Sequence, residues 1–417
     1  MDSKFPSNFY FGAATSAHQA EGENDNDWAE WELLSAPRLA KEATLRQDQG
    51  KWPDYILNPP AGGPDPLEAA NYISGKATDH YNRYEEDFDI AKRLGHNAHR
   101  FSIEWSRIEP KEGVWDEKEI EHYRKIILAL RKRKIEPFVT LWHWTLPLWL
   151  AKQGGVQNKN FPKYFERYAE KMAAEFKNDV RFWLTINEPE IYTLNSYFRG
   201  RRPPQKTGVV NFYRALAGLM AAHRTAYRAI KKISPSSTVG VVCNLSDFKS
   251  SGGPINAVLK IFFERSWNRH FLNRIKDDLD IVGLNFYFHY RINYGLNKNT
   301  NEVISDVGWD LHPEGIYSVL SDVKTYKKPV IIAESGLADS RDKYRAWFIK
   351  ETLRAVRQAM NEGADVRGYF HWSLTDNFEW DKGFWPRFGL VEIDYRTFAR
   401  KIRPSAFEYK KMIENGL

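Results

Sequence analysis

The sequence predicts an α/β fold, a single (β/α)8 barrel that spans residues 1–417 with long loops on its C-terminal face. Eight short apolar runs recur along the 417 residues, and longer amphipathic stretches separate them. Runs that are hydrophobic on both faces are typical of parallel strands covered by helices. Eight strand–helix units are the number that closes such a sheet into a barrel, with its chemistry at the carboxyl ends of the strands.

The predicted strands are rich in β-branched and aromatic residues. They occupy residues 9–14, 98–104, 137–142, 182–187, 238–244, 280–287, 329–334 and 368–374. Between them, apolar residues recur every three or four positions, as in residues 116–133 and 162–176, which predicts helices there. No glycine-rich phosphate turn follows the first strand, and this disfavours an open doubly wound sheet.

Three connections are long. Residues 34–76 are predicted to form an irregular insertion after the first strand, because they contain Pro-Pro, Gly-Gly-Pro and Asp-Pro sequences. This insertion is either a lid or binding loop, or an inert excursion over the barrel mouth. Residues 189–211 and 289–313 are expected on the catalytic face.

The composition narrows the function classes. Lys and Arg number 61 against 54 Asp and Glu, a net charge of +7, but the basic residues are scattered and predict solvated helix faces rather than a nucleic-acid surface. No run of eighteen apolar residues exists, so we expect no membrane span. The lone Cys243 excludes a disulfide framework and a cysteine-built zinc site. Without the apolar stretch of a signal peptide, a cytoplasmic location is predicted.

Aromatic residues are abundant, with 15 Trp and 21 Tyr. Their flat apolar faces and polar edges suit the faces and hydroxyls of sugars. Two carboxylates end otherwise apolar runs. Glu188 follows the fourth strand and Glu334 closes the seventh, so both are expected to point into the mouth of the barrel. A pair of carboxyl groups that flank a scissile bond is what glycosidic cleavage requires.

Seven motifs then resemble those of glycoside hydrolase family 1, the retaining β-glycosidases, from Phe5 to about Arg403. TINEPE (185–190) and IIAESG (331–336) are similar to the two signature motifs of the family. The other five are FPSNFYFGAATSAHQAEG, HRFSIEWSRIEP, VTLWHWTLP, GLNFY and HWSLTDNFEWDKGFWPRFGLVEIDY.

The resemblance implies that Glu188 is the general acid/base and Glu334 the nucleophile, which forms a covalent glycosyl-enzyme. In such retaining pairs the carboxyl groups lie about 5 to 5.5 Å apart. A negative Glu334 nearby raises the pKa of Glu188, which keeps the acid protonated in the free enzyme. Arg100 and Tyr287 are expected to hold the Glu334 carboxylate. Asn285 is expected to support the nucleophile side of the site, through Tyr287, rather than to touch sugar.

Sugar-binding positions also carry over from the resemblance. Those implied to hydrogen-bond the sugar are Gln19, His143, Asn187 and Glu379, while Trp372 is the stacking platform and Trp380 a further wall. Trp144, Trp149 and Trp183 are assigned to core packing. No metal or cofactor is implied, and the expected partner is a small β-glycoside or short oligosaccharide; the oligomeric state is left open.

Some positions depart from the family pattern. Ser335 follows the nucleophile where many members carry Asn, and the chain is short, so trimmed loops and an open aglycone region are expected. Glu379 and Pro386 replace the Ser and Lys of the 6-phospho-β-glycosidases, which argues against a phosphorylated sugar. Thioglucosidases lack the acid/base that Glu188 provides. A preference for galactosides or fucosides, and a mainly transglycosylating enzyme, stay open as alternatives. A non-catalytic sugar-binding barrel is disfavoured because both carboxylates are present.

Overall fold

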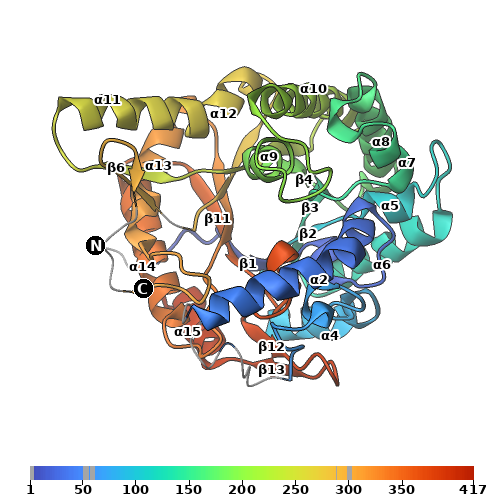
Figure 1. Cartoon of the computed structure of the whole chain (residues 1–417), viewed down its shortest axis with the longest axis horizontal. Helices are drawn as coiled ribbons and strands as arrows, with labels where there is room; N and C mark the ends of the chain where they lie inside the picture. The colour runs from blue at the N-terminus through green and yellow to red at the C-terminus, as the bar shows by residue number, and fades with distance from the viewer. Residues whose placement is uncertain (1–3, 50–55, 57–61, 288, 298–302) are drawn as a thin grey trace.

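The structure is a computed structural model that describes residues 4–49, 56, 62–287, 289–297 and 303–417. Eight parallel strands close into a barrel in the order β1-β11-β10-β7-β5-β4-β3-β2, which confirms the predicted fold class (Figure 1). The barrel strands are β1 (Tyr10–Ala14), β2 (Ala98–Ser102), β3 (Glu136–Trp142), β4 (Phe182–Asn187), β5 (Thr238–Asn244), β7 (Ile281–Asn285), β10 (Val330–Ser335) and β11 (Val366–Trp372).

Each barrel strand coincides with one of the eight apolar runs, because both faces of each strand are buried. One set of side chains fills the barrel interior and includes Phe138, Phe182 and Phe370. The Phe138 and Phe182 rings are stacked with centroids 4.1 Å apart. The opposite face of the strands packs against the outer helices in a larger apolar cluster. A strand buried on both sides therefore reads as a continuous apolar run rather than as an alternating pattern.

Helices surround the barrel (Figure 1). The helix predicted over 116–133 is α6 (Glu117–Lys132), which begins where the Asp116 side chain accepts hydrogen bonds from the backbone N–H groups of Lys118 and Glu119. The helix predicted over 162–176 is α8 (Phe161–Phe176). The other helices of eight or more residues outside the first connection are α4 (His80–Arg93), α10 (Val209–Ile233), α11 (Pro254–Phe263), α13 (Ile316–Val323), α14 (Arg345–Asn361) and α15 (Pro404–Asn415).

Short turns and strands complete the described chain. The short helices are α1 (Ala17–Ala20), η1 (Ala69–Tyr72), α5 (Trp105–Ile108), α7 (Leu148–Lys152), η2 (Gly155–Gln157), α9 (Pro189–Thr193), η3 (Leu194–Phe198), η4 (Glu264–Asn268), α12 (His270–Ile275), η5 (Pro313–Gly315), η6 (Lys324–Tyr326) and η7 (Trp380–Lys382). The strands outside the barrel are β6 (Asp247–Ser250), β8 (His289–Ile292), β9 (Leu296–Asn297), β12 (Val391–Ile393) and β13 (Arg400–Ile402).

The prediction of an irregular insertion over residues 34–76 was wrong for its first part. Residues 34–48 belong to α2 (Asp27–Asp48), which crosses in front of the barrel in Figure 1. Its first turn is capped by the Asn26 side chain, which accepts a hydrogen bond from the N–H of Ala29, and Trp28 and Trp31 bury its apolar side. The Pro- and Gly-rich sequences on which the prediction rested all lie beyond the end of this helix, at residues 59–66. Residues 50–55 and 57–61 of the insertion lie outside the described residues.

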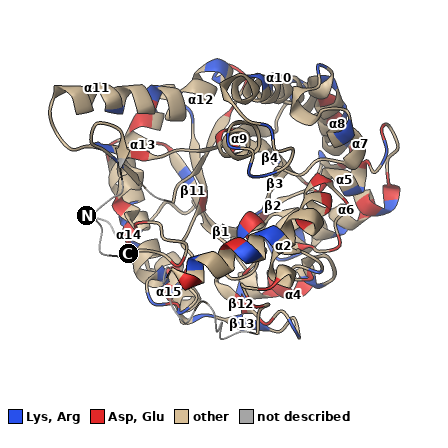
Figure 2. Cartoon of the chain, viewed as in Figure 1, with Lys and Arg blue, Asp and Glu red and all other residues tan. Residues whose placement is uncertain are grey.

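Charged side chains of both signs are interspersed over the helices in Figure 2, as expected for solvated faces. Within the described residues, none of the helices combines the length and the apolar character needed to cross a membrane.

Candidate active site

A pocket of about 310 Å³ opens among the segments that follow the barrel strands. It brings together nine of the predicted site residues, so positions far apart in the sequence meet in one cavity. These are Gln19, His143, Asn187, Glu188, Tyr287, Glu334, Trp372, Glu379 and Trp380. The remaining two predicted residues, Arg100 and Asn285, are fully buried and contact the pocket carboxylates from behind.

The backbone is irregular where the two carboxylates leave their strands. The register of β4 with β5 shifts between Leu184 and Asn187, and that of β10 with β7 shifts between Ile332 and Glu334. Such bulges change the direction in which a side chain points and are frequent near active sites. Glu188 also has a φ of +42°. A non-glycine residue there is strained, and the surrounding structure must hold it in place.

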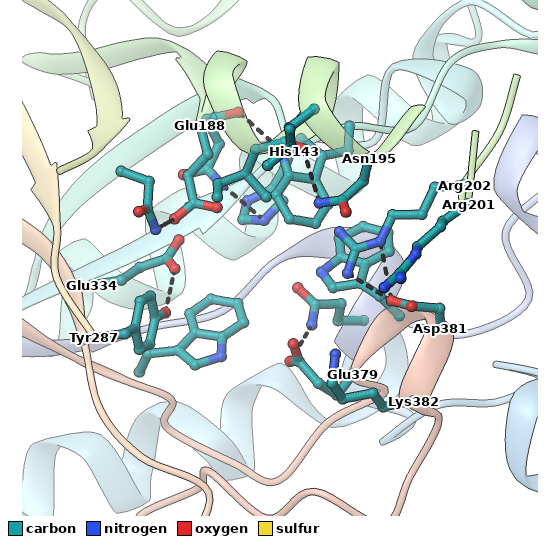
Figure 3. Close-up of a pocket in the computed structure, with 18 of the residues that line it drawn as sticks. His143, Glu188, Asn195, Arg201, Arg202, Tyr287, Glu334, Glu379, Asp381 and Lys382 are labelled. Carbon is teal, nitrogen blue, oxygen red and sulfur yellow. Dashed lines mark hydrogen bonds and ion pairs between the residues drawn. The ribbon is translucent and has the colours of Figure 1, made fainter. Parts of the chain in front are cut away.

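Glu334 is 3% exposed and holds two hydrogen bonds, one on each oxygen. The Arg100 guanidinium donates to Oε1, and the Tyr287 hydroxyl donates to Oε2 at 2.6 Å. Burial, followed by the charge of Glu334, raises the pKa of Tyr287 well above its usual value, so the phenol keeps its proton and remains a donor. Figure 3 shows Glu334 and Glu188 facing the same cavity. The arrangement presents a fixed carboxylate to the pocket.

Arg100 also orients the polar residues beside Glu334. Its Nη2 donates to Asn187 Oδ1 at 2.7 Å, and its Nε donates to Thr140 Oγ1 at 3.0 Å. Because Arg can only donate, the Asn187 oxygen must face it, and the Asn187 amide nitrogen then donates to His143 Nε2 at 3.1 Å. Burial lowers the pKa of His143 well below its usual value, so the ring is neutral.

Replacement of Arg100 by lysine is expected to lower kcat/KM on a β-glycoside by about 10²-fold, the usual cost of misplacing a catalytic group. Lysine keeps the positive charge but cannot bond Glu334, Asn187 and Thr140 at once from a planar fork. Steady-state kinetics with a thermal unfolding curve checks this. Full activity in a folded Arg100→Lys protein would show that charge alone is sufficient.

Glu188 lies in a different environment. It is 5% exposed, and its Oε1 accepts hydrogen bonds from Asn244 at 2.7 Å and from Asn285 at 2.9 Å. Because both amides donate to Oε1, the proton of the acid form belongs on Oε2. Burial, followed by the negative charge of Glu334, raises the pKa of Glu188 to about 7. The pocket thus holds one carboxylate paired with a cation and one carboxyl group that is protonated at mildly acidic pH.

One expectation from the sequence is corrected here. Asn285 was expected to support the nucleophile side, but its amide donates to Glu188 and, at 3.3 Å, to Asn187 Oδ1. β7 and β4 flank β5 in the barrel, so the carboxyl end of β7 lies near that of β4, and this geometry is not visible in the sequence. Trp144 packs in the large apolar cluster, as assigned, and it also lines the pocket and donates from Nε1 to the Asn187 carbonyl at 3.0 Å.

The side of the pocket opposite the carboxylate pair is built from α1 and the segment after β11. Gln19 Nε2 donates to the Phe378 carbonyl at 2.9 Å and to Glu379 Oε2 at 3.3 Å. Burial raises the pKa of Glu379 to about 7. Trp380 packs against Trp144 with ring centroids 4.7 Å apart. Amides, a carboxyl group and indole rings together suit the hydroxyls and faces of a sugar.

Several lining residues were missed by the sequence interpretation. Asn244 ends β5 as Asn285 ends β7, so its position at a strand end was the available signal. The others lie in short helices, in β8 and in loops beyond the strand ends, and the sequence interpretation gave none of them a role, although Asp381, Lys382 and Phe388 belong to one of the quoted motifs. The further lining residues are Ile191, Leu194, Asn195, Arg199, Arg201, Arg202, Tyr290, Trp309, Asp381, Lys382 and Phe388.

Among the described residues, one group has the composition of a metal site. Ligand atoms of Asp247, His289 and His312 lie within 4.8 Å of one another. The Lys249 ammonium lies 2.6 Å from His312 Nε2 and 3.9 Å from Asp247 Oδ2. The Lys249 ammonium therefore occupies the position near these atoms where a metal ion would carry its positive charge, and this disfavours a metal site here.

A parallel barrel with a pair of buried carboxyl groups at its mouth, in two different environments, defines the class of glycoside hydrolases that work with paired carboxylates. Residues 67–256 and 269–416 match the family described as Glycosyl hydrolase family 1, and the chain belongs to this family.

Relatives and solved structures match almost the whole of this chain. Beta-glucosidase A of Thermotoga maritima is 30% identical over 465 residues, covering 99% of this chain and 98% of the relative. The beta-glycosidase from Pyrococcus horikoshii is 33% identical with a TM-score of 0.86, covering 99% of this chain and 95% of that one. The family 1 glucosidase from Thermotoga maritima in complex with isofagomine lactam is 28% identical with a TM-score of 0.86, covering 100% of both chains.

Proposed function

We propose that this enzyme hydrolyses terminal β-D-glucosides with retention of anomeric configuration, through a covalent glycosyl-enzyme. The observation that carries the proposal is the pair Glu188 and Glu334 in one pocket with opposite environments: a raised pKa for Glu188, and an arginine and a tyrosine donor on Glu334. Their difference matches the two roles that retaining cleavage needs, a proton donor and a nucleophile.

In the first step, Glu334 Oε2 or Oε1 attacks the anomeric carbon while Glu188 donates its proton to the leaving oxygen. The bond to the aglycone breaks as the bond to Glu334 forms. Esterification removes the negative charge of Glu334, one of the two main causes of the raised pKa of Glu188. The pKa of Glu188 then falls, and its carboxylate can take a proton from the water that releases the sugar.

The remaining features of the proposal follow from the pocket. Gln19, His143, Asn187 and Glu379 bind the sugar hydroxyls, with Trp372 and Trp380 against its faces, while Arg100, Tyr287 and Asn285 position the carboxyl groups. Glucose is favoured because several relatives are beta-glucosidases, and galactosides and fucosides are the alternatives. Cys243 is buried and unpaired, consistent with a cytoplasmic enzyme that acts as one domain.

The stereochemistry of the reaction tests the proposal. With p-nitrophenyl β-D-glucoside as substrate, proton NMR should detect β-glucose as the first product, before mutarotation. Parallel assays with the β-galactoside and β-fucoside then rank the sugars. Initial release of α-glucose would contradict the two-step mechanism, and no turnover of any of the three would contradict the β-glycosidase assignment.

The pH dependence of kcat/KM should show an alkaline limb near pH 7. Glu188 must be protonated to act as an acid, and its pKa is raised to about 7, so activity falls as the pH rises through this value. Initial rates between pH 4 and pH 9 measure the limb. In the Glu188→Gln variant, assayed with 2,4-dinitrophenyl β-D-glucoside, the limb should disappear; its persistence would assign it to another group.

A further inference from the structure

The outer part of the pocket is lined by four cations, Arg199, Arg201, Arg202 and Lys382. Arg202 is held by Asp381, which accepts from its Nε at 3.0 Å and from its Nη2 at 2.6 Å. Among the described residues, Arg202 is the only one of the four cations that forms an ion pair with a carboxylate. Figure 3 places Lys382 beside Glu379, and the charge of Lys382 lowers the pKa of that carboxyl group against the larger effect of burial.

Arg199 and Arg201 therefore contribute positive charge that nothing described neutralises. Both are exposed and lie on the loop that follows η3. Backbone hydrogen bonds anchor this loop: the Arg201 N–H donates to the Asn195 carbonyl at 2.9 Å, and the Gly208 N–H donates to the Phe198 carbonyl at 3.1 Å. The two guanidinium groups are consequently carried on an ordered segment at the pocket rather than on a free chain.

An aromatic wall runs outward from the nucleophile. Tyr287, which bonds Glu334, lies 5.5 Å from Trp309 between ring centroids, and Trp309 lies 6.2 Å from Phe388. Tyr290 also lines the pocket, and the charge of Arg199 lowers its pKa against the larger effect of burial. The wall and the arginines thus line the same cavity as the carboxylate pair.

We propose that the leaving-group region of this pocket binds an aromatic aglycone that carries a carboxylate, so that β-glycosides of phenolic acids are preferred substrates. The aromatic ring packs on Trp309 and Phe388, and the carboxylate is bound by Arg199 and Arg201. A guanidinium group matches a carboxylate with two parallel hydrogen bonds and is weakly hydrated, which favours it over lysine for this task. This inference rests on the proposed function.

The test compares 4-carboxyphenyl β-D-glucoside with its neutral methyl ester. The measured quantity is the ratio of the two kcat/KM values, because the ratio cancels effects on the chemistry common to both substrates. In the double variant Arg199→Gln/Arg201→Gln the ratio should fall about 10- to 100-fold, the loss expected for hydrogen bonds to a charged group. In the wild type, 0.5 M NaCl should lower the same ratio because salt screens exposed charges.

Arg228 provides the matched control. Its side chain is 68% exposed on α10, and it does not line the pocket, so Arg228→Gln removes one positive charge elsewhere and should leave the ratio unchanged. Single variants at Arg199 and Arg201 replace the double variant if it does not fold. An unchanged ratio in folded variants would overturn the inference while leaving the hydrolase in place. Failure of the wild type to hydrolyse the neutral ester and p-nitrophenyl β-D-glucoside would instead overturn the proposed function, and the inference with it.

Discussion

Glu334→Ala is expected to lower kcat/KM for p-nitrophenyl β-D-glucoside by roughly 10⁴- to 10⁶-fold, the range seen when a member of a nucleophilic catalytic unit is removed. In the variant, no described group takes the place of the two carboxylate oxygens that Arg100 and Tyr287 bind. The first displacement therefore has no attacking atom. The loss should be equally severe for substrates with good leaving groups, because the nucleophile is required whatever the leaving group. Steady-state rates with p-nitrophenyl and 2,4-dinitrophenyl β-D-glucosides measure this.

Glu190 offers a control of the same residue type. It is 3% exposed in α9, two residues from Glu188, but does not line the pocket. Burial raises its pKa to about 8, so the group is mainly protonated at pH 6 and glutamine resembles that form. Glu190→Gln should retain activity within about tenfold. Comparable rates for Glu334→Ala and wild type would remove Glu334 from the mechanism. Restoration of turnover in Glu334→Ala by azide, with formation of an α-glucosyl azide, would support it.

Glu188→Ala is expected to have an effect that depends on the leaving group. With p-nitrophenyl β-D-glucoside, kcat/KM should fall about 10²- to 10⁴-fold, the usual contribution of a general acid. With 2,4-dinitrophenyl β-D-glucoside, whose leaving group needs little protonation, kcat/KM should fall much less. Hydrolysis of the glycosyl-enzyme then becomes slow because no base activates water, so rapid mixing should show a burst of dinitrophenol followed by slow turnover.

Asn244 supplies the comparison for this prediction. Asn244→Ala removes one of the two amides that donate to Glu188 Oε1 but leaves the acid in place. Since these amides favour the charged form, their loss should shift the alkaline limb of the pH profile upward, with the burst absent. An equal loss for both leaving groups in Glu188→Ala would assign the acid role to another residue.

The architecture could be predicted from the sequence because strands buried on both faces must be apolar throughout. All eight barrel strands were located in this way, and helices α6 and α8 followed from their apolar periodicity. Helix α2 was missed because the Pro- and Gly-rich residues further along suggested a loop for the whole segment, whereas burial of Trp28 and Trp31 stabilises the helix. Tertiary packing here outweighs a local signal.

The carboxylate pair and seven further residues that line the pocket could also be predicted, because they end strands or lie in motifs similar to those of a known family. The partner of Asn285 could not. Whether its amide reaches Glu188 or Glu334 depends on the closure of the barrel and on the bulges in β4 and β10, and Asn285 and Glu188 are 97 residues apart in the sequence.

The sequence by itself determined the barrel, the two carboxylates and the family resemblance, because burial and strand ends leave marks in the local pattern. Only the tertiary structure decided how the carboxyl groups differ. The raised pKa of Glu188 requires burial and the proximity of Glu334, and the hydrogen bonds to Glu334 come from Arg100 on β2 and from Tyr287 beyond β7. The position of the arginines in the outer pocket was also decided only by the tertiary structure. The electrostatic interaction between charged groups depends on their distance in space and not on their separation along the chain.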